Sequence, residues 1–377
     1  MSDRLKHSRM ELRLEAEIAE AATPMEADCK RAELAGYHAR LGRFDEARST
    51  LSTLRQRYDQ RPNAAISSWL NLVEGLVGHF SDMDPAARDK VLRAHALSTA
   101  AGLTSIRALS AAWLAHLDYA RLDVEAMSKH VREAFQLSVP TQDVVRSRAC
   151  LVVAQALHLS GRYSESVAWY QRTRFHSNRC GDEATLGASL HNMAWLHMST
   201  MRQSQFTGNI NSAETAWALV SAESTRNFDD IFGLTALASL QPILRAQVLS
   251  LRGQFSEALF LYDAHPVTSQ VPGAVRLRAN LLADQAWCRI STGDGVGALE
   301  DALAALSSLG MDVQIDDLAA AHTRLSQVFS ALGRSNEAEH HGRLASVAWE
   351  SFISLQLELY RYSVGISKDE ATRDYKL

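Results

Sequence analysis

This chain of 377 residues has few cysteines, a small net charge and no long apolar run. Its four cysteines (Cys29, Cys150, Cys180 and Cys288) lie far apart and form no CxxC pair. This spacing indicates buried thiols in a reducing compartment and excludes a dense disulfide scaffold. The formal net charge is only −4, so electrostatics provide no general attraction to nucleic acid or to an anionic membrane. We therefore predict neither nucleic acid nor a membrane as a partner.

No apolar run is long enough to span a bilayer, and the N-terminus carries charged side chains where a signal peptide would be apolar. We therefore expect a cytoplasmic protein. Proline is also rare, at seven residues, and runs of β-branched residues are few, whereas Ala and Leu dominate. This composition favours helix throughout the chain.

Catalytic and metal-binding signatures are missing as well. Residues 293–297 read Gly-Asp-Gly-Val-Gly, but they lack the Gly-Lys-Ser/Thr ending of a phosphate-binding loop and a strand before it. His191 and His197 are six residues apart, which places them on different faces of a helix and makes them a poor metal pair. No GxSxG nucleophile elbow occurs. We predict no catalytic residue, no metal and no cofactor, so the chain is not expected to be an enzyme.

What the sequence does contain is a repeated turn. The six-residue phrase that begins at Gly42 and ends at Ala47 returns at 161–166, 253–258 and 333–338, with weaker copies at 208–213 and 293–298. Each copy lies between two apolar runs with helical spacing. A glycine can end the first helix in the left-handed conformation, and the small residue at the end of the phrase lets two helix backbones approach closely. Each copy therefore predicts the elbow of an antiparallel helix pair.

The spacing of these elbows predicts a repeat architecture. The period is roughly 40 residues, which is typical of helical-hairpin solenoids. Two intervals are longer, and we place insertions at 201–206 and 224–230. The small residue recurs at Ala47, Ala86, Ala126, Ser166, Ala213, Ala258, Ala298 and Ala338. We predict an all-α fold: a right-handed superhelical solenoid of about eight antiparallel hairpins over 26–348, with capping helices at 1–25 and 349–362 and a frayed tail at 363–377.

With the repeats aligned, the pattern resembles the tetratricopeptide repeat. That motif has a small residue in the first helix, Gly at the elbow, an aromatic after it and Ala in the second helix. The period here is closer to about 40 residues than to the 34 of the standard motif. In this longer period the chain resembles the longer-helix sensor arrays of bacterial signalling proteins, such as the maltose-type transcription activators. The matching positions are Ala35, Ala154, Ala246, Ala286 and Ser326 in first helices, Gly42, Gly161, Gly253, Gly293 and Gly333 at elbows, and Phe44, Tyr163 and Phe255 after them.

The resemblance implies a binding surface on the concave face, which the first helices of such arrays line. The residue after the small one points into that face. Amide side chains there could bond a peptide backbone and aromatic rings could pack its side chains. The alternative is that the tryptophans pack between hairpins and the glutamines are only solvated. The candidate site residues are Arg148, Gln155, His158, His191, Trp195, Gln247, Asn280, Trp287, Thr323 and Gln327.

Two functional hypotheses from different classes follow. The first is a non-catalytic scaffold or sensor that binds a protein segment or a peptide. The second is an obligate partner subunit of an enzyme, or an enzyme with a site across the hairpins, and a deep pocket with inward titratable groups near 201–211 would favour it. A third, weaker hypothesis is a homodimer formed through the terminal helix at 349–362, because that segment is more apolar than one hairpin requires.

Overall fold

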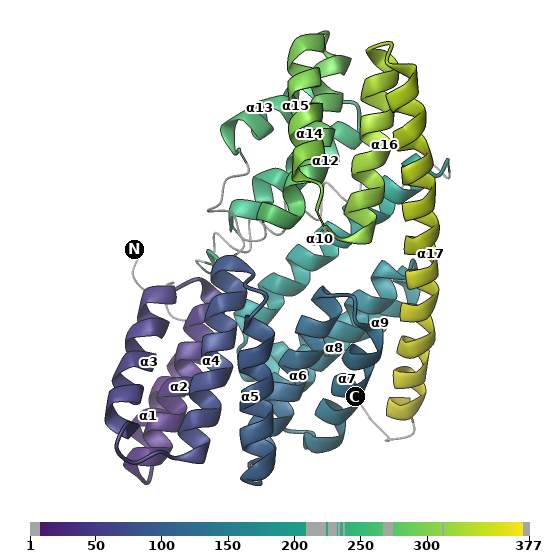
Figure 1. Cartoon of the computed structure of the whole chain (residues 1–377). Coiled ribbons are helices and arrows are strands. Elements are labelled where there is room, and N and C mark those ends of the chain that lie inside the picture. The colour runs from purple at the N-terminus through teal and green to yellow at the C-terminus, as the bar shows by residue number, and fades with distance from the viewer. Residues whose placement is uncertain are drawn as a thin grey trace. The chain divides into compact units, whose positions relative to one another are not determined.

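The computed structural model describes residues 8–208, 224, 232, 234–236, 238–266, 274–310 and 313–371. Within these ranges the regular structure is helical and no strand occurs, so the all-α prediction is confirmed. None of the described helices is both long and apolar enough to cross a membrane. Figure 1 shows the helices in chain order. They are α1 (Arg9–Ala19), α2 (Pro24–Leu41), α3 (Phe44–Tyr58), α4 (Ala64–Asp82), α5 (Ala87–Ala100), α6 (Thr104–Ala120), α7 (Val124–Leu137), α8 (Asp143–Leu159), α9 (Tyr163–Cys180), α10 (Glu183–Phe206), the 3-10 helix η1 (Ala238–Leu240), α12 (Gln241–Leu251), α13 (Phe255–Ala264), α14 (Ala274–Ser291), α15 (Gly295–Ser308), α16 (Ile315–Ala331) and α17 (Ser335–Ala371).

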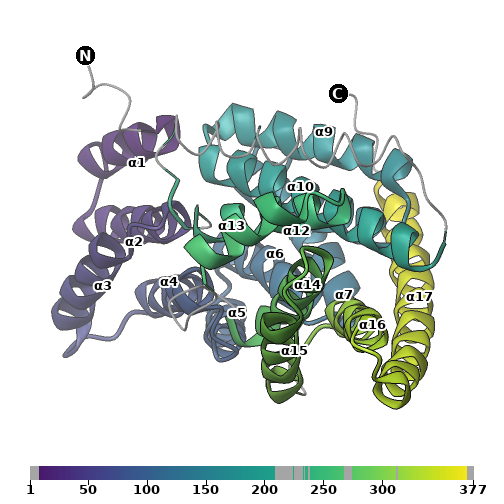
Figure 2. The same cartoon turned by 90° about the horizontal axis from the view of Figure 1, so that it is seen from above.

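Successive helices pack as hairpins. The pairs α2/α3, α4/α5, α6/α7, α8/α9, α12/α13 and α14/α15 are each in contact, and the short elbow inside each pair makes its two helices antiparallel. The first helices also contact each other from one hairpin to the next, as α2 with α4 and α6 with α8. Figure 2 shows α2 beside α3 and α4. The repeated-hairpin architecture is therefore confirmed, whereas its right-handed superhelical course stays a prediction.

The chain divides into two compact units. The first, here called the N-terminal unit, comprises Met1–Leu190, Asn227–Ala238 and Glu358–Leu377. The second, here called the C-terminal unit, comprises His191–Arg226 and Ser239–Leu357. The sequence boundaries, which treated 26–348 as one array, did not foresee this division.

Small residues account for the close packing inside each hairpin. In the N-terminal unit Ala35 and Ala47 are essentially unexposed and belong to one core with Leu72 and Val91. Gly75 occupies the corresponding place in α4: a Cβ added there would lie 2.6 Å from Val91 Cγ2 and 2.8 Å from the Ala87 carbonyl oxygen. In the C-terminal unit the same role falls to alanines on α14, α15 and α16. The buried ones are Ala283, Ala286, Ala298, Ala302, Ala305 and Ala321.

The elbows have the predicted backbone conformation. The residue with positive φ is Gly42 (89°) after α2 and Gly161 (76°) after α8, and the glycines at 253, 293 and 333 follow the same rule. The second and third hairpins lack the glycine, yet their elbows still use a left-handed residue, Met83 (φ 51°) and Leu122 (φ 59°). The turn geometry therefore persists where the sequence signal is lost.

Two elbow glycines give a matched test of this geometry. Gly161→Ala is expected to lower the free energy of unfolding by about 1–2 kcal/mol, because no atom lies within 4 Å of the new methyl group and only the left-handed backbone is strained. Gly42→Ala is expected to cost clearly more, since its Cβ would lie 2.6 Å from the backbone nitrogen of Ala236. Equilibrium denaturant unfolding of both variants checks this, and equal losses would contradict it.

Two segments differ from the sequence prediction, and two others lie mostly outside the described residues. Helix α10 continues to Phe206, so 201–206 extend a helix and do not form a looped insertion. Pro242 lies in the first turn of α12, where its missing amide costs nothing, and so marks the start of that helix at Gln241. Residues 209–213 of the weaker elbow copy lie outside the described residues, as does most of the insertion predicted at 224–230. Helix α17 runs without a break to Ala371, through the predicted boundaries near 348 and 362, with Leu359 and Ile366 buried.

Candidate functional site

The candidate residues from the sequence fall in both units, so each unit is considered by itself. Three of them, Arg148, Gln155 and His158, lie on α8 in the N-terminal unit, and all three are buried. The C-terminal unit holds the others. There, His191, Gln247 and Asn280 are buried, and Trp195, Trp287, Thr323 and Gln327 are partly buried.

Most of the C-terminal candidates contact other side chains of that unit. Asn280 Nδ2 donates to Asp317 Oδ1 at 2.9 Å, and Gln327 Oε1 accepts from Arg324 at 3.0 Å. Thr323 Oγ1 accepts from the Trp349 indole at 3.1 Å. Trp195 stacks on His191, with ring centroids 6.3 Å apart, and Trp287 meets Phe255 edge-on at 6.3 Å. Their role in ligand binding stays a prediction.

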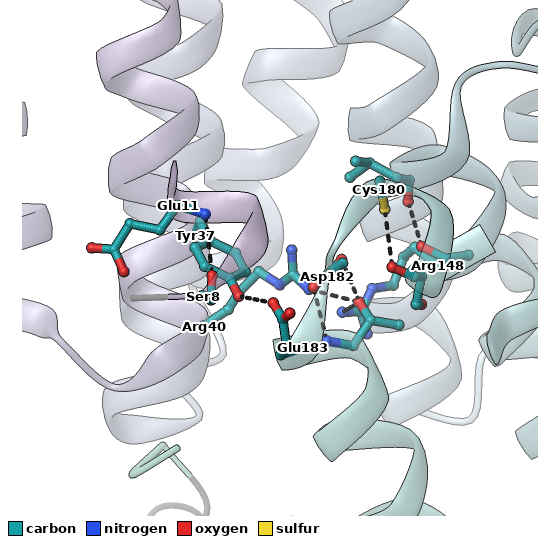
Figure 3. Close-up of polar contacts among 12 residues, drawn as sticks. Ser8, Glu11, Tyr37, Arg40, Arg148, Cys180, Asp182 and Glu183 are labelled. Atoms are coloured by element: carbon teal, nitrogen blue, oxygen red, sulfur yellow. Dashed lines mark hydrogen bonds and ion pairs between the residues drawn. The ribbon is translucent and has the colours of Figure 1, made fainter. Parts of the chain in front are cut away.

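The N-terminal unit contains a buried polar cluster that the first helices share. We call it the Arg40–Arg148 cluster. Figure 3 shows Arg40 reaching it from one side and Arg148 from the other, with Asp182 between them. Its members come from α2, α6, α8 and the start of α10. They are Tyr37, Arg40, Trp113, His116, Arg148, Asp182 and Thr185.

Asp182 organises one side of the cluster. It precedes α10 and accepts hydrogen bonds from the backbone amide of Thr185 at 2.9 Å and from its hydroxyl at 2.8 Å, as an N-cap residue does. It also forms an ion pair with Arg40 Nη2. Burial raises the pKa of Asp182, but Arg40 and the Thr185 amide outweigh burial, so the pKa lies below its usual value. Asp182 is therefore an ionised carboxylate at neutral pH.

Arg148 occupies the other side of the cluster and is only 2% exposed. Its Nη2 donates to Thr185 Oγ1 at 3.1 Å, and its Cζ lies 4.0 Å from the centroid of the Trp113 ring. Among the described residues it forms no ion pair with a carboxylate. Burial and then the charge of Arg40 lower the pKa of Arg148 to about 9, so the guanidinium still carries its charge at pH 7.

Two further groups leave the net charge of the cluster unchanged, because one is neutral and the other is a carboxylate paired with Arg9. His116 is partly buried, its buried Nδ1 atom forms no hydrogen bond among the described residues, and its ring meets Trp113 edge-on at 5.7 Å. Burial and then Arg148 hold the pKa of His116 well below its usual value, so it is neutral. Glu183 lies next to the cluster but is bonded to Arg9 at 2.9 Å and to the Tyr37 hydroxyl at 3.2 Å. The cluster itself thus sets two guanidinium groups against the carboxylate of Asp182.

The C-terminal unit has a contrasting network in which cations and carboxylates are paired. Arg202 contacts Asp316 and Asp317, each at 2.9 Å. Arg324 contacts Asp284 at 2.7 Å, and Asp284 also accepts from the Tyr262 hydroxyl at 2.7 Å. Every guanidinium in this network has its own carboxylate, so the network joins hairpins and has no surplus positive charge.

Sequence reasoning found Arg148 but missed the rest of the cluster. One signal was available: His116 follows Ala115 as Gln155 follows Ala154, roughly 40 residues earlier, which is the period of the repeat. The third hairpin lacks an elbow glycine, and that hid the position. Asp182 after Gly181 also had the residue type of a helix N-cap. Arg40 and Trp113 had no periodic signal, because their contacts with Arg148 depend on tertiary packing.

Comparison with known proteins does not assign a family. No protein-family model matches the chain, and no curated protein matches it. Among solved structures, the chain is similar to a monomeric mutant of IFIT1 with Gppp-AAAA, at 13% sequence identity and a TM-score of 0.43, over 89% of this chain and 84% of that chain. What the fold and the cluster define is a class: an all-helical protein of repeated hairpins.

One sequence prediction is corrected by this comparison. The net charge predicts no nucleic acid as a partner, yet the solved IFIT1 mutant that aligns with 89% of this chain is a structure with Gppp-AAAA. The exclusion was wrong in principle, because net charge averages over the whole molecule and does not report a local pair of cations such as Arg40 and Arg148.

Proposed function

We propose that the chain is a non-catalytic scaffold that binds a protein segment or peptide along the first helices of its hairpins. One observation supports this most directly. Gln155 and Gln247 occupy the same position of the repeat, each following an alanine with no exposed surface, and they are only 2% and 3% exposed. The Oε1 atom of each has no hydrogen-bond donor among the described residues.

A buried acceptor without a donor costs about 1–3 kcal/mol. Its recurrence on α8 and α12, at equivalent positions of two separate units, favours a shared role over an accident of packing. The backbone amides of an extended peptide are donors of the required kind. We propose that a peptide supplies them, and that the signalling role of the arrays that this sequence resembles applies here too.

The test is selection from a display library of random peptides, followed by calorimetry with the enriched peptides. Gln155→Leu and Gln247→Leu keep the side-chain volume but remove the acceptor, and each is expected to weaken binding by several-fold, up to about tenfold, for one lost hydrogen bond. Gln171→Leu on α9 is the matched control because Gln171 is exposed on the second helix of the same hairpin. Undiminished affinity in both Gln155 and Gln247 variants would contradict the proposal. So would enrichment of no peptide, or tighter binding of an RNA oligonucleotide than of any peptide.

The predicted homodimer remains a hypothesis within this proposal. The part of α17 in the C-terminal unit exposes four aliphatic side chains, Leu344 (37%), Val347 (61%), Ile353 (44%) and Leu357 (64%). Such side chains are compatible with a partner helix but do not identify one.

A further inference from the structure

The surplus cation in the Arg40–Arg148 cluster requires an explanation. A buried charge without a partner is costly, since taking an ion out of water carries a penalty of several kcal/mol even after relaxation. Elsewhere in the described chain the buried guanidiniums of Arg202 and Arg324 each face a carboxylate, and Arg146 bonds the carbonyl oxygens of Ser138 and Val139 at 3.0 and 3.1 Å. Arg148 is the exception among these, because its hydrogen bond goes to a neutral hydroxyl that Arg40 also uses.

The hydroxyl of Thr185 has no capacity left for a further partner. It donates to Asp182 at 2.8 Å and accepts from Arg40 at 2.6 Å and from Arg148 at 3.1 Å. A hydroxyl has one donor and two acceptor sites, so this set fills it. Arg148 has five N–H donors in a planar fork, of which one bond to Thr185 is accounted for. The other donors can hold an oxyanion in a bidentate manner.

Charge decides between the oxyanions. Arg40 and Arg148 carry two positive charges and Asp182 carries one negative charge, so a monoanion neutralises the cluster. A phosphate monoester carries about −1.5 to −2 at pH 7 and would leave a buried surplus of negative charge. A carboxylate has the correct charge and the planar geometry that a guanidinium fork matches.

Burial decides the size of the ligand. Tyr37, Trp113, Arg148, Asp182 and Thr185 are each 2% exposed or less. If the C-terminal carboxylate of a peptide bound here, the rest of the peptide would have to pass between these buried groups to reach solvent. A small acid has no such remaining chain. The indole ring of Trp113 carries the Arg148 guanidinium at 4.0 Å and the Arg40 guanidinium at 5.7 Å, so it fixes where the two cations lie.

We propose that Arg148 and Arg40, with Trp113, form a binding site for the carboxylate of a small organic acid. The acid links α2, α6 and α8 to the start of α10, and so stabilises the N-terminal unit when it binds. This site is independent of the proposed peptide scaffold: it lies in one unit, uses different side chains and has its own probes.

The experiment measures the Tm of the full chain with acetate, butyrate, benzoate and indole-3-acetate against chloride, sulfate and phosphate at matched ionic strength. At least one monocarboxylate is expected to raise the Tm by about 2–4 °C or more beyond the inorganic anions when it is well above its Kd. Isothermal titration calorimetry with the same acid gives the stoichiometry, which is expected to be one per chain.

Arg148→Met separates a specific site from a general salt effect. Without ligand its Tm is expected to equal or exceed that of the parent chain, because the unpaired buried charge is gone, and the response to the acid is expected to disappear. Arg148→Lys keeps the charge without the fork and is expected to bind at least tenfold more weakly. Arg146→Met is the matched control: Arg146 is also buried on α8, and its loss lowers the Tm but leaves the shift caused by the acid.

Three results would overturn the proposal. The first is no monocarboxylate exceeding sulfate or phosphate. The second is an equal shift in the parent chain and in Arg148→Met. The third is a shift that requires a peptide with a free C-terminus and is absent with every small acid. None of these bears on the Gln155 and Gln247 variants, so failure here and failure of the peptide scaffold are distinguishable.

Discussion

Replacing Asp182 by alanine is expected to lower the free energy of unfolding of the N-terminal unit by about 3–5 kcal/mol, the usual cost of removing one partner from a buried ion pair. Arg40 and Arg148 would then face each other with no carboxylate between them. The variant also loses the N-cap of α10, which adds about 1 kcal/mol. Equilibrium denaturation, followed by a signal from the N-terminal unit such as Trp113 fluorescence, measures the loss.

Asp182→Asn separates the two contributions, because asparagine is a good N-cap but carries no charge. It is expected to retain the cap and lose the ion pair. Adding Arg148→Met to Asp182→Asn removes one of the two unpaired cations, and the double variant is expected to be more stable than Asp182→Asn alone. If Asp182→Ala lowered the free energy of unfolding by less than about 1 kcal/mol, the Arg40–Asp182 ion pair would be as weak as a hydrated surface pair. That result would contradict the conclusion that Asp182 balances one of two buried guanidinium charges.

The pH dependence of this effect has a defined sign. The folded-state pKa of Asp182 lies below its unfolded value, so its stabilisation is fully present above an unfolded pKa of about 3.9 and is lost as the pH falls through the folded pKa. The parent chain therefore loses this contribution in acid, whereas Asp182→Asn has none to lose. The difference in stability between the two proteins is expected to shrink as the pH falls below about 4.

The second large effect is expected from Arg202→Met in the C-terminal unit. Its guanidinium lies 2.9 Å from both Asp316 and Asp317, and neither carboxylate has another cationic partner among the described residues. Removing Arg202 leaves two buried carboxylates facing each other, so the free energy of unfolding is expected to fall by about 3–5 kcal/mol at pH 7.5. Arg343→Met is the control: that side chain is 64% exposed in its pair with Glu339, and its loss is expected to cost under about 1 kcal/mol.

The cost of Arg202→Met is expected to diminish in mild acid. Burial and the neighbouring charge of Asp316 already raise the pKa of Asp317 to about 6 with Arg202 in place. A carboxyl whose folded pKa lies above its unfolded value takes up protons more readily in the folded state, so stability is gained as the pH falls from that pKa towards about 4. Without Arg202 the pKa rises further, and the variant is expected to recover part of its stability between pH 7.5 and pH 5. A cost independent of pH would contradict the pairing.

Much of the local structure could be predicted from the sequence because it depends on near neighbours. The repeat identified the elbow glycines at 42, 161, 253, 293 and 333, and each has the left-handed backbone that was predicted for the end of a first helix. The small residues at 35, 47, 258 and 298 were recognised in the same way and are buried between helices. Where the motif degenerated, at Met83 and Leu122, the period still located the hairpin although the glycine was absent.

The candidate site was predicted only in part. The repeat frame led to Arg148, Gln155 and Gln247, since these lie at or near a fixed position of first helices. The repeat frame did not predict Arg40 or Trp113, which lie outside that position. They join the cluster because Arg40 on α2 and Arg148 on α8 both lie over the ring of Trp113 on α6. Nor could the period show that Arg202 and Arg324 each have a carboxylate while Arg148 does not.

By itself the sequence determined that this chain is helical, that its helices form hairpins of about 40 residues, and which small residues lie between them. These features follow from backbone preferences and from contacts within one repeat, and both are encoded locally. Only the tertiary structure decided which charges meet. Arg40 and Asp182 are 142 positions apart, so whether a buried cation finds a carboxylate depends on how successive first helices pack, and no local pattern contains that information.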